Sequence, residues 1–335
     1  VDSSAVSLQT RTDRAEEAFA IYADVIRNPA FAEEELDRAR QQSLDGLMVA
    51  LSEPGSIGSM AMTRAIFGAG PYGAVATANT LGAITTENAR AFHQTYWRPD
   101  TAVLVITGDV SAEEGFALAE RHFGSWPNAG GARPQSPDVS THAPAARTIV
   151  VDLPQTGQAA VLMGLRGVAR SDADYLPLLV ANNVLGGGYS ARLNAEIRIR
   201  RGLSYGAGSS LSARLGPGPI VASAQTRNDA AVQVYELMRA EIVRIGRDLT
   251  PEAEMNARKA VLIGGFARSV ETTSGLAGQI STLALFGLPP SSLNTYVADI
   301  TAVTPAQARD AAARYFRADA ADARTGEDFL LSHSP

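Results

Sequence analysis

The chain has 335 residues, of which 45% are hydrophobic and 19% are charged. This length exceeds what one hydrophobic core usually fills, so we expect two domains, and the composition excludes a disordered chain. The net charge of -6 and the lack of a long Lys/Arg run argue against a nucleic-acid partner, because phosphate binding needs clustered cations. The absence of cysteine excludes disulfides and thiolate metal sites, and no apolar run is long enough to span a bilayer.

The first recognisable element, at residues 7–26, recurs later in the chain. Its sequence, SLQTRTDRAEEAFAIYADVI, matches SAQTRNDAAVQVYELMRAEI at residues 223–242, with Gln-Thr-Arg-x-Asp identical in both. Each copy starts with a strand-like segment and continues as an amphipathic helix, for which Asp13 and Asp229 are the expected N-caps. This match predicts an internal repeat.

A second pair of segments supports the repeat. Residues 83–100 and 302–319 both read as a Thr-capped helix that ends in two aromatic residues, Arg and a nearby Asp, and this pair has nearly the same offset as the first. We therefore expect a first repeat unit at 1–145 and a second at 146–335, separated by a Pro/Ala/Ser-rich linker at 128–146. When the offset between the two copies is subtracted from the start of the second unit, the start of the first unit falls before Val1. We therefore expect the first unit to be incomplete at its N-terminus, so that a signal peptide or early motif would not be visible in this sequence.

The second unit contains a regular alternation of predicted elements. Strands are expected at 147–153, 158–165, 204–215 and 220–226, and helices at 173–185, 191–201, 230–247, 251–272 and 274–286, with a last helix from Pro305. The Gly-Pro-Gly-Pro sequence at 216–219 suits a hairpin turn. Hairpin strands with helices in blocks predict an α+β fold with a largely antiparallel sheet.

Several longer stretches resemble the insulinase or pitrilysin superfamily of zinc peptidases, to which mitochondrial processing peptidase belongs. The stretches are VIRNPAF (25–31), YWRPD (96–100), DYLPLLVANNVLGGG (174–188), RLNAEIR (192–198) and GLSY (202–205). The resemblance implies two homologous α/β roll units, each a mostly antiparallel sheet covered by helices, that together form half of a clamshell around a peptide. It covers almost the whole chain.

Catalytic members of that superfamily carry a His-x-x-Glu-His motif and a third zinc ligand, Glu, on a later helix. This chain has no such motif, and the helix that corresponds to the later one, at 32–47, has Gly46 at the ligand position and Ala39 where catalytic relatives have another Glu. Asp45 is adjacent, but one helical step turns it about 100° away. We therefore expect no metal site and no cofactor in this chain, with zinc held by a partner chain.

The remaining candidate ligands have simpler explanations. The four histidines, His93, His122, His142 and His333, show no ligand spacing and are interpreted as structural or exposed. Three acids at 33–35 begin a helix, where the macrodipole favours negative charge.

The resemblance implies chemical roles for Arg198 and Tyr205, which have the seven-residue spacing of an Arg and a Tyr that grip the substrate backbone and polarise its carbonyl in the family. The alternative is that Arg198 is one of several helix-end cations before Gly202. The glycines Gly186, Gly187 and Gly188 end a helix, with Ser190 as the expected next N-cap, and the resemblance places them near the cleft as substrate-binding residues.

These features favour a non-catalytic subunit of a zinc-dependent endopeptidase, which binds peptides or unfolded polypeptides and supplies Arg198 and Tyr205 to a homologous catalytic chain in a heterodimer. Two alternatives stay open. One is a proteolytically silent structural subunit of the core-protein type, and the other is the catalytic chain itself with its zinc motif in a preceding segment. The resemblance suggests the bacterial periplasm as location, with the cytoplasm as the other option.

Overall fold

The computed structural model describes residues 2–128, 130–134, 148–154, 156–317 and 332–333. Most of the predicted linker, and His142 with it, lies outside these residues. The chain forms two compact units: the first comprises residues 1–47, 76–137 and 267–290, and the second comprises 48–75, 138–266 and 291–335. These units are defined by spatial contacts, whereas the two repeat units were defined by sequence similarity, and the latter division stays a prediction.

The regular secondary structure of the first unit is helical in its described residues. It contains the 3-10 turn η1 (Thr12–Arg14) and the helices α1 (Ala15–Arg27), most of α2 (Glu33–Ala50), α4 (Ala78–Gly82), α5 (Thr86–Tyr96), α6 (Ala112–Phe123) and α11 (Thr273–Leu285). No strand is assigned among these described residues, and segments 2–10 and 102–107 have no regular secondary structure. The sheet expected for the first repeat is therefore not found in this part of the chain.

The caps of the repeated helices differ in part from expectation. Thr85 and Thr304 form capping boxes with Asn88 and Gln307, as the sequence predicts. The prediction of an N-cap at Asp13 was wrong, because the 3-10 turn η1 precedes α1 and Asp13 pairs with Arg11 at 2.9 Å instead. The same holds in the second copy, where η4 (Asn228–Ala230) precedes α9 (Ala231–Arg247) and Asp229 pairs with Arg227 at 2.7 Å.

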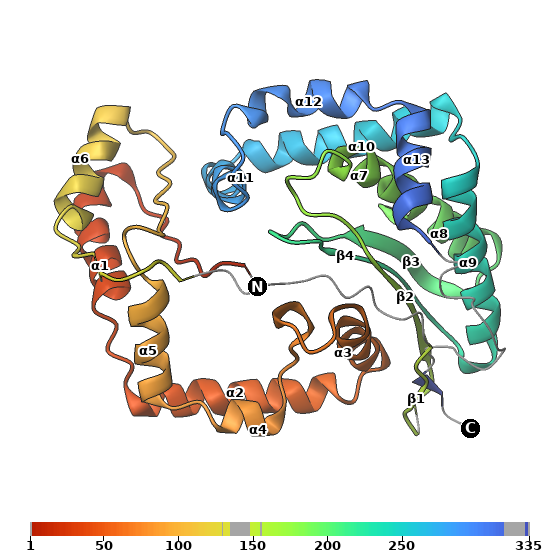
Figure 1. Cartoon of the computed structure of the whole chain (residues 1–335), viewed down its shortest axis with the longest axis horizontal. Helices are drawn as coiled ribbons and strands as arrows, with labels where there is room; N and C mark the ends of the chain where they lie inside the picture. The colour runs from red at the N-terminus through yellow and green to blue at the C-terminus, as the bar shows by residue number, and fades with distance from the viewer. Residues whose placement is uncertain (1, 129, 135–147, 155, 318–331, 334–335) are drawn as a thin grey trace. The chain divides into compact units, whose positions relative to one another are not determined.

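The second unit is built on an antiparallel sheet, as predicted (Figure 1). Its strand order is β2 (Ala159–Arg166), β4 (Pro219–Thr226), β3 (Ser204–Leu211), and Leu162 of β2 lies opposite Ser223 of β4. The predicted hairpin joins β3 to β4. A separate pair, β1 (Val151–Asp152) and β5 (Ser332–His333), is parallel. The α+β fold class is therefore confirmed.

Successive residues of β2 pack against opposite faces of this sheet. Ala159 and Val161 belong to the main core, whereas Ala160 and Leu162 pack against α3 (Pro54–Phe67). This alternation follows from the two-residue period of a strand. The sheet is thus covered by helices on both faces.

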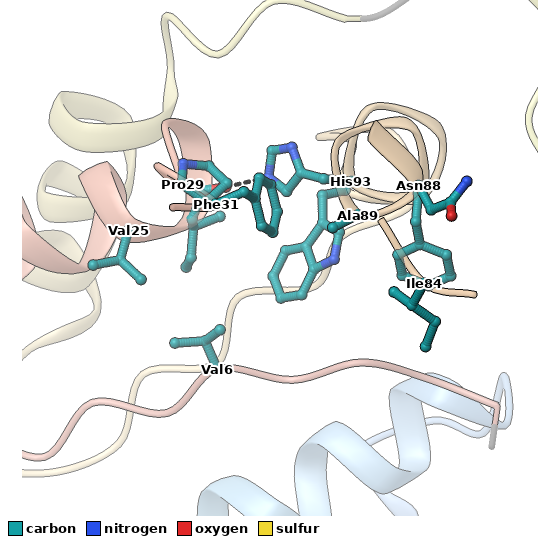
Figure 2. Close-up of a pocket in the computed structure, with 11 residues that line it drawn as sticks. Val6, Val25, Pro29, Phe31, Ile84, Asn88, Ala89 and His93 are labelled. Carbon is teal, nitrogen blue, oxygen red and sulfur yellow. Dashed lines mark hydrogen bonds between the residues drawn. The ribbon is translucent and has the colours of Figure 1, made fainter. Parts of the chain in front are cut away.

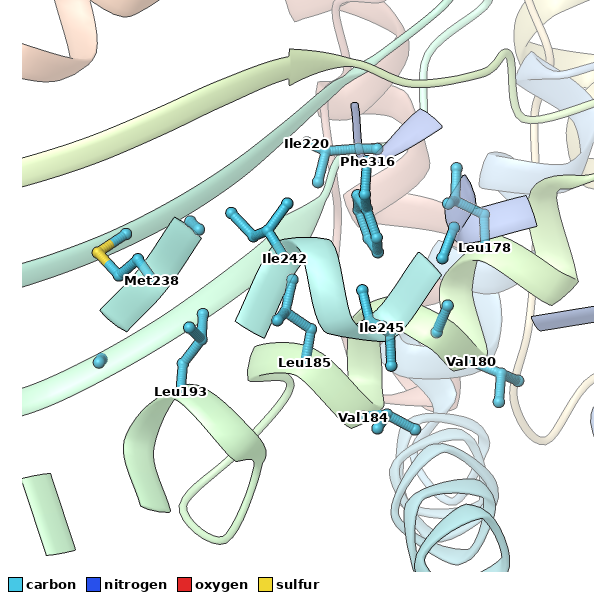
Figure 3. Packing of buried hydrophobic residues seen from close by; sticks show 14 of the residues in the cluster. Leu178, Val180, Val184, Leu185, Leu193, Ile220, Met238, Ile242, Ile245 and Phe316 are labelled. Carbon is cyan, nitrogen blue, oxygen red and sulfur yellow. The ribbon is translucent and has the colours of Figure 1, made fainter. Parts of the chain in front are cut away.

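The main core lies between the sheet and the helices α7 (Tyr175–Gly186), α9 and α13 (Pro305–Tyr315). Figure 3 shows its fully buried side chains, which include Leu178, Leu185, Ile242 and Ile245. Helix α7 is apolar around nearly its whole circumference, which is the pattern expected of a helix enclosed by protein. This core fixes the position of the segment that follows α7.

Among the described residues, the remaining elements are two short helical turns and three helices. They are η2 (Pro71–Gly73), α8 (Arg192–Asn194), the π-helical turn η3 (Ala195–Arg200), α10 (Glu252–Val270) and α12 (Ser292–Ala302). Helix α12 was not predicted from the sequence. Among the described residues, no helix has the length and hydropathy that a membrane span requires.

Candidate functional site

Arg198 lies on the π-helical turn η3, directly before the chain reverses into β3. The N–H of Gly202 donates to the carbonyl of Arg198 at 3.0 Å, and the N–H of Leu203 donates to the carbonyl of Ile197 at 2.9 Å. Gly202 has a φ of +63°, a left-handed conformation that suits glycine at a helix end. Single π-turns often mark functional sites, because the wider turn re-aims a side chain.

Tyr205 lies on β3 at a local irregularity of the sheet. The register between β3 and β4 shifts between Ser204 and Ala207, and the Ser204 hydroxyl accepts from the N–H of Gly206 at 3.0 Å. Such a bulge turns a side chain out of the regular pleat. The Tyr205 side chain is 88% exposed, and the guanidinium carbon of Arg198 lies 4.9 Å from its ring centroid. The structure therefore brings the two predicted residues together.

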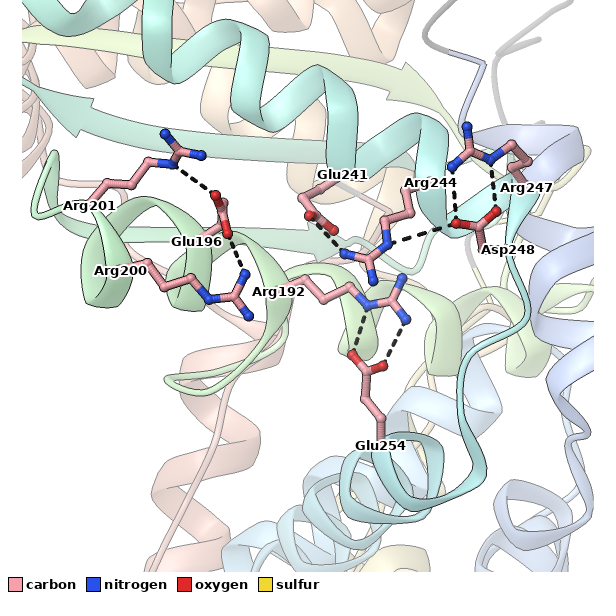
Figure 4. A network of polar contacts seen from close by, with 9 residues as sticks. All are labelled: Arg192, Glu196, Arg200, Arg201, Glu241, Arg244, Arg247, Asp248 and Glu254. Carbon is pink, nitrogen blue, oxygen red and sulfur yellow. Dashed lines mark hydrogen bonds and ion pairs between the residues drawn. The ribbon is translucent and has the colours of Figure 1, made fainter.

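The arginines near Arg198 are paired with a carboxylate (Figure 4). Glu196 accepts from Arg200 at 2.6 Å and from Arg201 at 2.8 Å, and its hydrogen bonds to Arg201 and Arg200 lower the pKa of its carboxyl. Among the described residues, Arg198 has no carboxylate partner. The interpretation as ordinary helix-end cations thus fits Arg200 and Arg201, whereas the guanidinium of Arg198 faces aromatic rings.

The three glycines differ in their surroundings. A Cβ on Gly186 would lie 2.1 Å from the backbone nitrogen of Ser209, so Gly186 permits close packing of α7 against β3. A Cβ on Gly187 would lie 2.4 Å from the Asn183 side chain, whereas Gly188 is exposed and has no atom closer than 3.9 Å to this position. Of the three predicted substrate-binding residues, Gly188 has the most open surroundings.

The loop after the glycines is held by buried polar side chains. Ser190 was expected to cap the next helix, but that prediction was wrong: Ala191 is the N-cap of α8, and the Ser190 hydroxyl accepts from the buried Arg258 at 2.6 Å. Asn194, which is 4% exposed, donates to the carbonyl of Tyr189 and accepts from the N–H of Ala207 at 3.2 Å.

Sequence reasoning missed Tyr189, the second aromatic neighbour of Arg198. Its ring centroid lies 5.1 Å from the guanidinium carbon of Arg198, and its side chain is 67% exposed. An aromatic residue directly after a glycine run was the available signal, but without the fold it could not be connected to Arg198.

The described residues contain no cluster of three or more His, Cys, Asp or Glu that could hold a metal ion. Gly46 is exposed on α2, with no atom within 4 Å of the position that a Cβ would occupy. His93 donates from Nε2 to the carbonyl of Ile26 at 2.7 Å, and His122 contacts Glu16 at 3.0 Å. Both contacts agree with the structural interpretation of these two histidines.

The first unit contains a pocket of about 480 Å³ that was not predicted (Figure 2). Its walls are mostly apolar: Val6, Val25, Ile26, Pro29, Phe31, Ile84, Asn88, Ala89, Phe92, His93 and Trp97. His93 is the titratable lining residue, and its Nε2 is already bonded within the unit. The pocket offers a hydrophobic surface but no set of groups for acid–base or metal chemistry.

Comparison with known proteins relates this chain to a family of peptidases. The family model described as the peptidase M16 inactive domain matches residues 83–262. An uncharacterized zinc protease of Mycobacterium leprae is 29% identical over 264 residues, which are 77% of this chain and 58% of that protein. The chain thus spans less than two thirds of the length of this relative.

Two solved structures show the same fold. The crystal structure of a peptidase M16 inactive domain from Pseudomonas fluorescens superposes with a TM-score of 0.86 at 23% identity, covering 97% of this chain and 76% of that one. The periplasmic protease PqqL from Escherichia coli superposes with a TM-score of 0.75 at 15% identity, covering 97% of this chain and 36% of that one. The chain belongs to the family described as the peptidase M16 inactive domain, which confirms the predicted relationship to insulinase-type zinc peptidases.

Proposed function

We propose that this chain is a non-catalytic, substrate-binding subunit of a zinc-dependent endopeptidase. It binds peptide or unfolded polypeptide and supplies Arg198 and Tyr205 to the zinc site of a homologous catalytic chain in a heterodimer. The observation that carries the proposal is the contact between Arg198 and Tyr205, in which the guanidinium has no carboxylate partner among the described residues. The family description as an inactive domain supports the same role.

The chemistry of the pair suits this role. A guanidinium presents several N–H donors in a fixed plane, and the Tyr205 phenol adds one more on a largely exposed side chain. Both donors fit the carbonyl oxygen of a bound peptide, which gains negative charge as water attacks the carbonyl carbon. Zinc in the partner chain would activate that water. Gly188 leaves room for the peptide backbone beside this pair.

The test mixes this chain with a homologous chain that carries His-x-x-Glu-His, and measures hydrolysis of an unstructured peptide. We expect neither bound zinc nor cleavage for this chain alone, and cleavage by the mixture. Arg198→Ala should lower kcat of the mixture about 100- to 1000-fold, the usual cost of losing one oxyanion donor, and Tyr205→Phe should also lower it. Arg200→Ala is the matched control, because Arg200 is paired with Glu196.

The other outcomes identify the alternatives. Mixtures that form a complex but never cleave would support a proteolytically silent structural subunit. Stoichiometric zinc in the full-length gene product of this chain alone would support a catalytic chain. Full activity of the mixture containing Arg198→Ala and Tyr205→Phe would contradict the roles proposed for these two residues.

We also propose a periplasmic location. The solved E. coli protease that shares this fold is described as periplasmic, and this supports the same compartment here. Fractionation of the native host with an antibody to this chain is the direct measurement. Recovery with the cytoplasmic fraction would overturn the proposal.

A further inference from the structure

We infer that Tyr189 is a positioning residue for Arg198, and that its ring sets the affinity of this site for peptide main chain. The inference rests on the proposed peptide-binding function. It adds a residue outside the Arg198 and Tyr205 pair, from the loop that follows the glycine run.

The first support is the placement of the two rings around one cation. The guanidinium carbon of Arg198 lies 5.1 Å from the Tyr189 centroid and 4.9 Å from the Tyr205 centroid. Both distances are within the range in which a cation is attracted to the face of an aromatic ring. Two rings restrict the guanidinium more than one ring would. The N–H donors that are not turned toward the rings stay available for carbonyl oxygens.

The second support is the rigid attachment of the loop. The Tyr189 carbonyl accepts from the side chain of Asn194, whose oxygen in turn accepts from the N–H of Ala207 on β3. The next residue, Ser190, accepts from the buried Arg258. The loop at Tyr189 and Ser190 is thus tied both to the strand that carries Tyr205 and to α10, which fixes the backbone from which the Tyr189 ring extends toward Arg198.

The third support is exposure. Tyr189 keeps 67% of its surface in contact with solvent although its backbone is anchored on two sides. A fold-stabilising tyrosine normally buries its ring, whereas a large, exposed aromatic on an anchored loop is typical of a binding surface. Ring and cation together form a surface on which an extended peptide finds apolar contact and hydrogen-bond donors side by side.

The physical consequence is a lower entropic cost of binding. An arginine side chain loses much rotamer freedom when it is ordered by a ligand. If Tyr189 already restricts Arg198, less freedom remains to be lost, and the peptide binds more tightly. Loss of the ring should therefore weaken affinity without abolishing it. The phenol hydroxyl of Tyr189 takes no part in this argument.

The experiment compares the wild type with Tyr189→Leu, Tyr189→Phe and, as a matched control, Ile199→Ala, all in the full chain. Ile199 is also an exposed apolar residue, on the same π-helical turn as Arg198. NMR of arginine-labelled protein follows the Arg198 side-chain protons, assigned by their loss in Arg198→Lys. Fluorescence anisotropy follows binding of a short unstructured labelled peptide built of Ala, Ser and Gln.

We expect the Arg198 protons to be shifted upfield by the two rings in the wild type, in Tyr189→Phe and in Ile199→Ala. In Tyr189→Leu, the upfield shift should shrink and the affinity should fall about five- to tenfold, because Arg198 is less often held in the orientation that binds peptide once the cation–π contact is lost. An unchanged Arg198 spectrum or an unchanged affinity in Tyr189→Leu overturns the inference. If the wild type binds no peptide, the proposed function fails instead, and the NMR measurement alone decides whether Tyr189 positions Arg198.

Discussion

The two compact units differ in how much apolar surface they bury. The second unit encloses a continuous core between a sheet and three helices, with many side chains fully buried. In the described part of the first unit, the buried hydrophobic residues are Phe19, Ala23, Ile26 and Leu283. Large apolar side chains there stay exposed, among them Ile21, Val25, Phe92, Tyr96 and Val103.

A comparison of the repeated helices α1 and α9 explains why the two units bury different amounts of apolar surface. Ile26 of α1 and its counterpart Ile242 of α9 are both buried. Helix α9, however, packs on the sheet and on α13, and also buries Val234, Met238 and Ile245. Helix α1 has no sheet partner among the described residues of its unit. Similar amphipathic sequences are therefore buried to different extents, because burial depends on what lies against the helix.

The largest loss in the free energy of unfolding is expected for a substitution in the core of the second unit. Leu178→Ala removes a fully buried side chain and should lower the free energy of unfolding by about 2–5 kcal/mol, because a cavity is left. Phe92→Ala, at a side chain that is 51% exposed in the first unit, should cost about 1 kcal/mol or less. Urea unfolding followed by far-UV circular dichroism measures the first variant. Tryptophan fluorescence suits the second, because Trp97 and Trp126 both lie in the first unit.

Equal losses in the two variants would contradict this contrast between the units. Leu51→Ala, at an exposed leucine of the second unit, is the control for the chemistry of the leucine substitution. It should change the free energy of unfolding by about 0.5 kcal/mol or less.

A smaller loss in the free energy of unfolding is expected when the ion pair between Arg192 and Glu254 in the second unit is broken. Arg192 is 8% exposed and donates to both carboxylate oxygens at 2.7 and 2.8 Å, and this hydrogen bonding lowers the pKa of Glu254 below its ordinary value of 4.5. Glu254→Gln should cost about 1–3 kcal/mol at neutral pH, as expected for a charged hydrogen bond.

The sign of the pH dependence follows from the lowered pKa. The stabilisation by Glu254 is complete above pH 4.5, the ordinary pKa of its carboxyl group. It is lost as the pH falls through the lower pKa that this carboxyl group has in the folded protein. The difference in unfolding free energy between wild type and Glu254→Gln should therefore shrink from about pH 4.5 downward. A difference that stays constant to pH 2 would show that charge is not its cause. Glu236→Gln, a substitution on α9, is the control.

The smallest expected effects have opposite signs at two glycines. Gly202→Ala places a side chain at a φ of +63° and should cost about 1–2 kcal/mol, although no atom lies within 4 Å of the new Cβ. Gly46→Ala, in the exposed helix α2 with equally open surroundings, should stabilise the protein by about 0.5–1 kcal/mol. Thermal unfolding of both variants measures the pair. A stabilising Gly202→Ala would mean that the left-handed turn before β3 is not required.

Local patterns predicted most of the second unit correctly. The hairpin turn between the strands now seen as β3 and β4 predicted the antiparallel sheet. The Thr caps predicted two helix starts, at Thr304 in this unit and at Thr85 in the first unit. Patterns of this kind act over a few neighbouring residues, so they can be read from sequence. The predictions of N-caps at Asp13 and Asp229 were wrong, because each carboxylate forms an ion pair with the arginine two residues earlier, and this contact competes with capping.

By itself, the sequence determined the family, the fold class and the seven-residue spacing of Arg198 and Tyr205, because motifs, periodicity and turn residues are local properties of the chain. Only the tertiary structure decided that, of the neighbouring Arg198, Arg200 and Arg201, it is Arg198 that contacts aromatic rings and not Glu196, and that Tyr189 is one of these rings. Tyr189 reaches Arg198 because buried Asn194 and Arg258 anchor its loop. Contacts of this kind depend on packing between separate elements, and no short stretch of sequence encodes them.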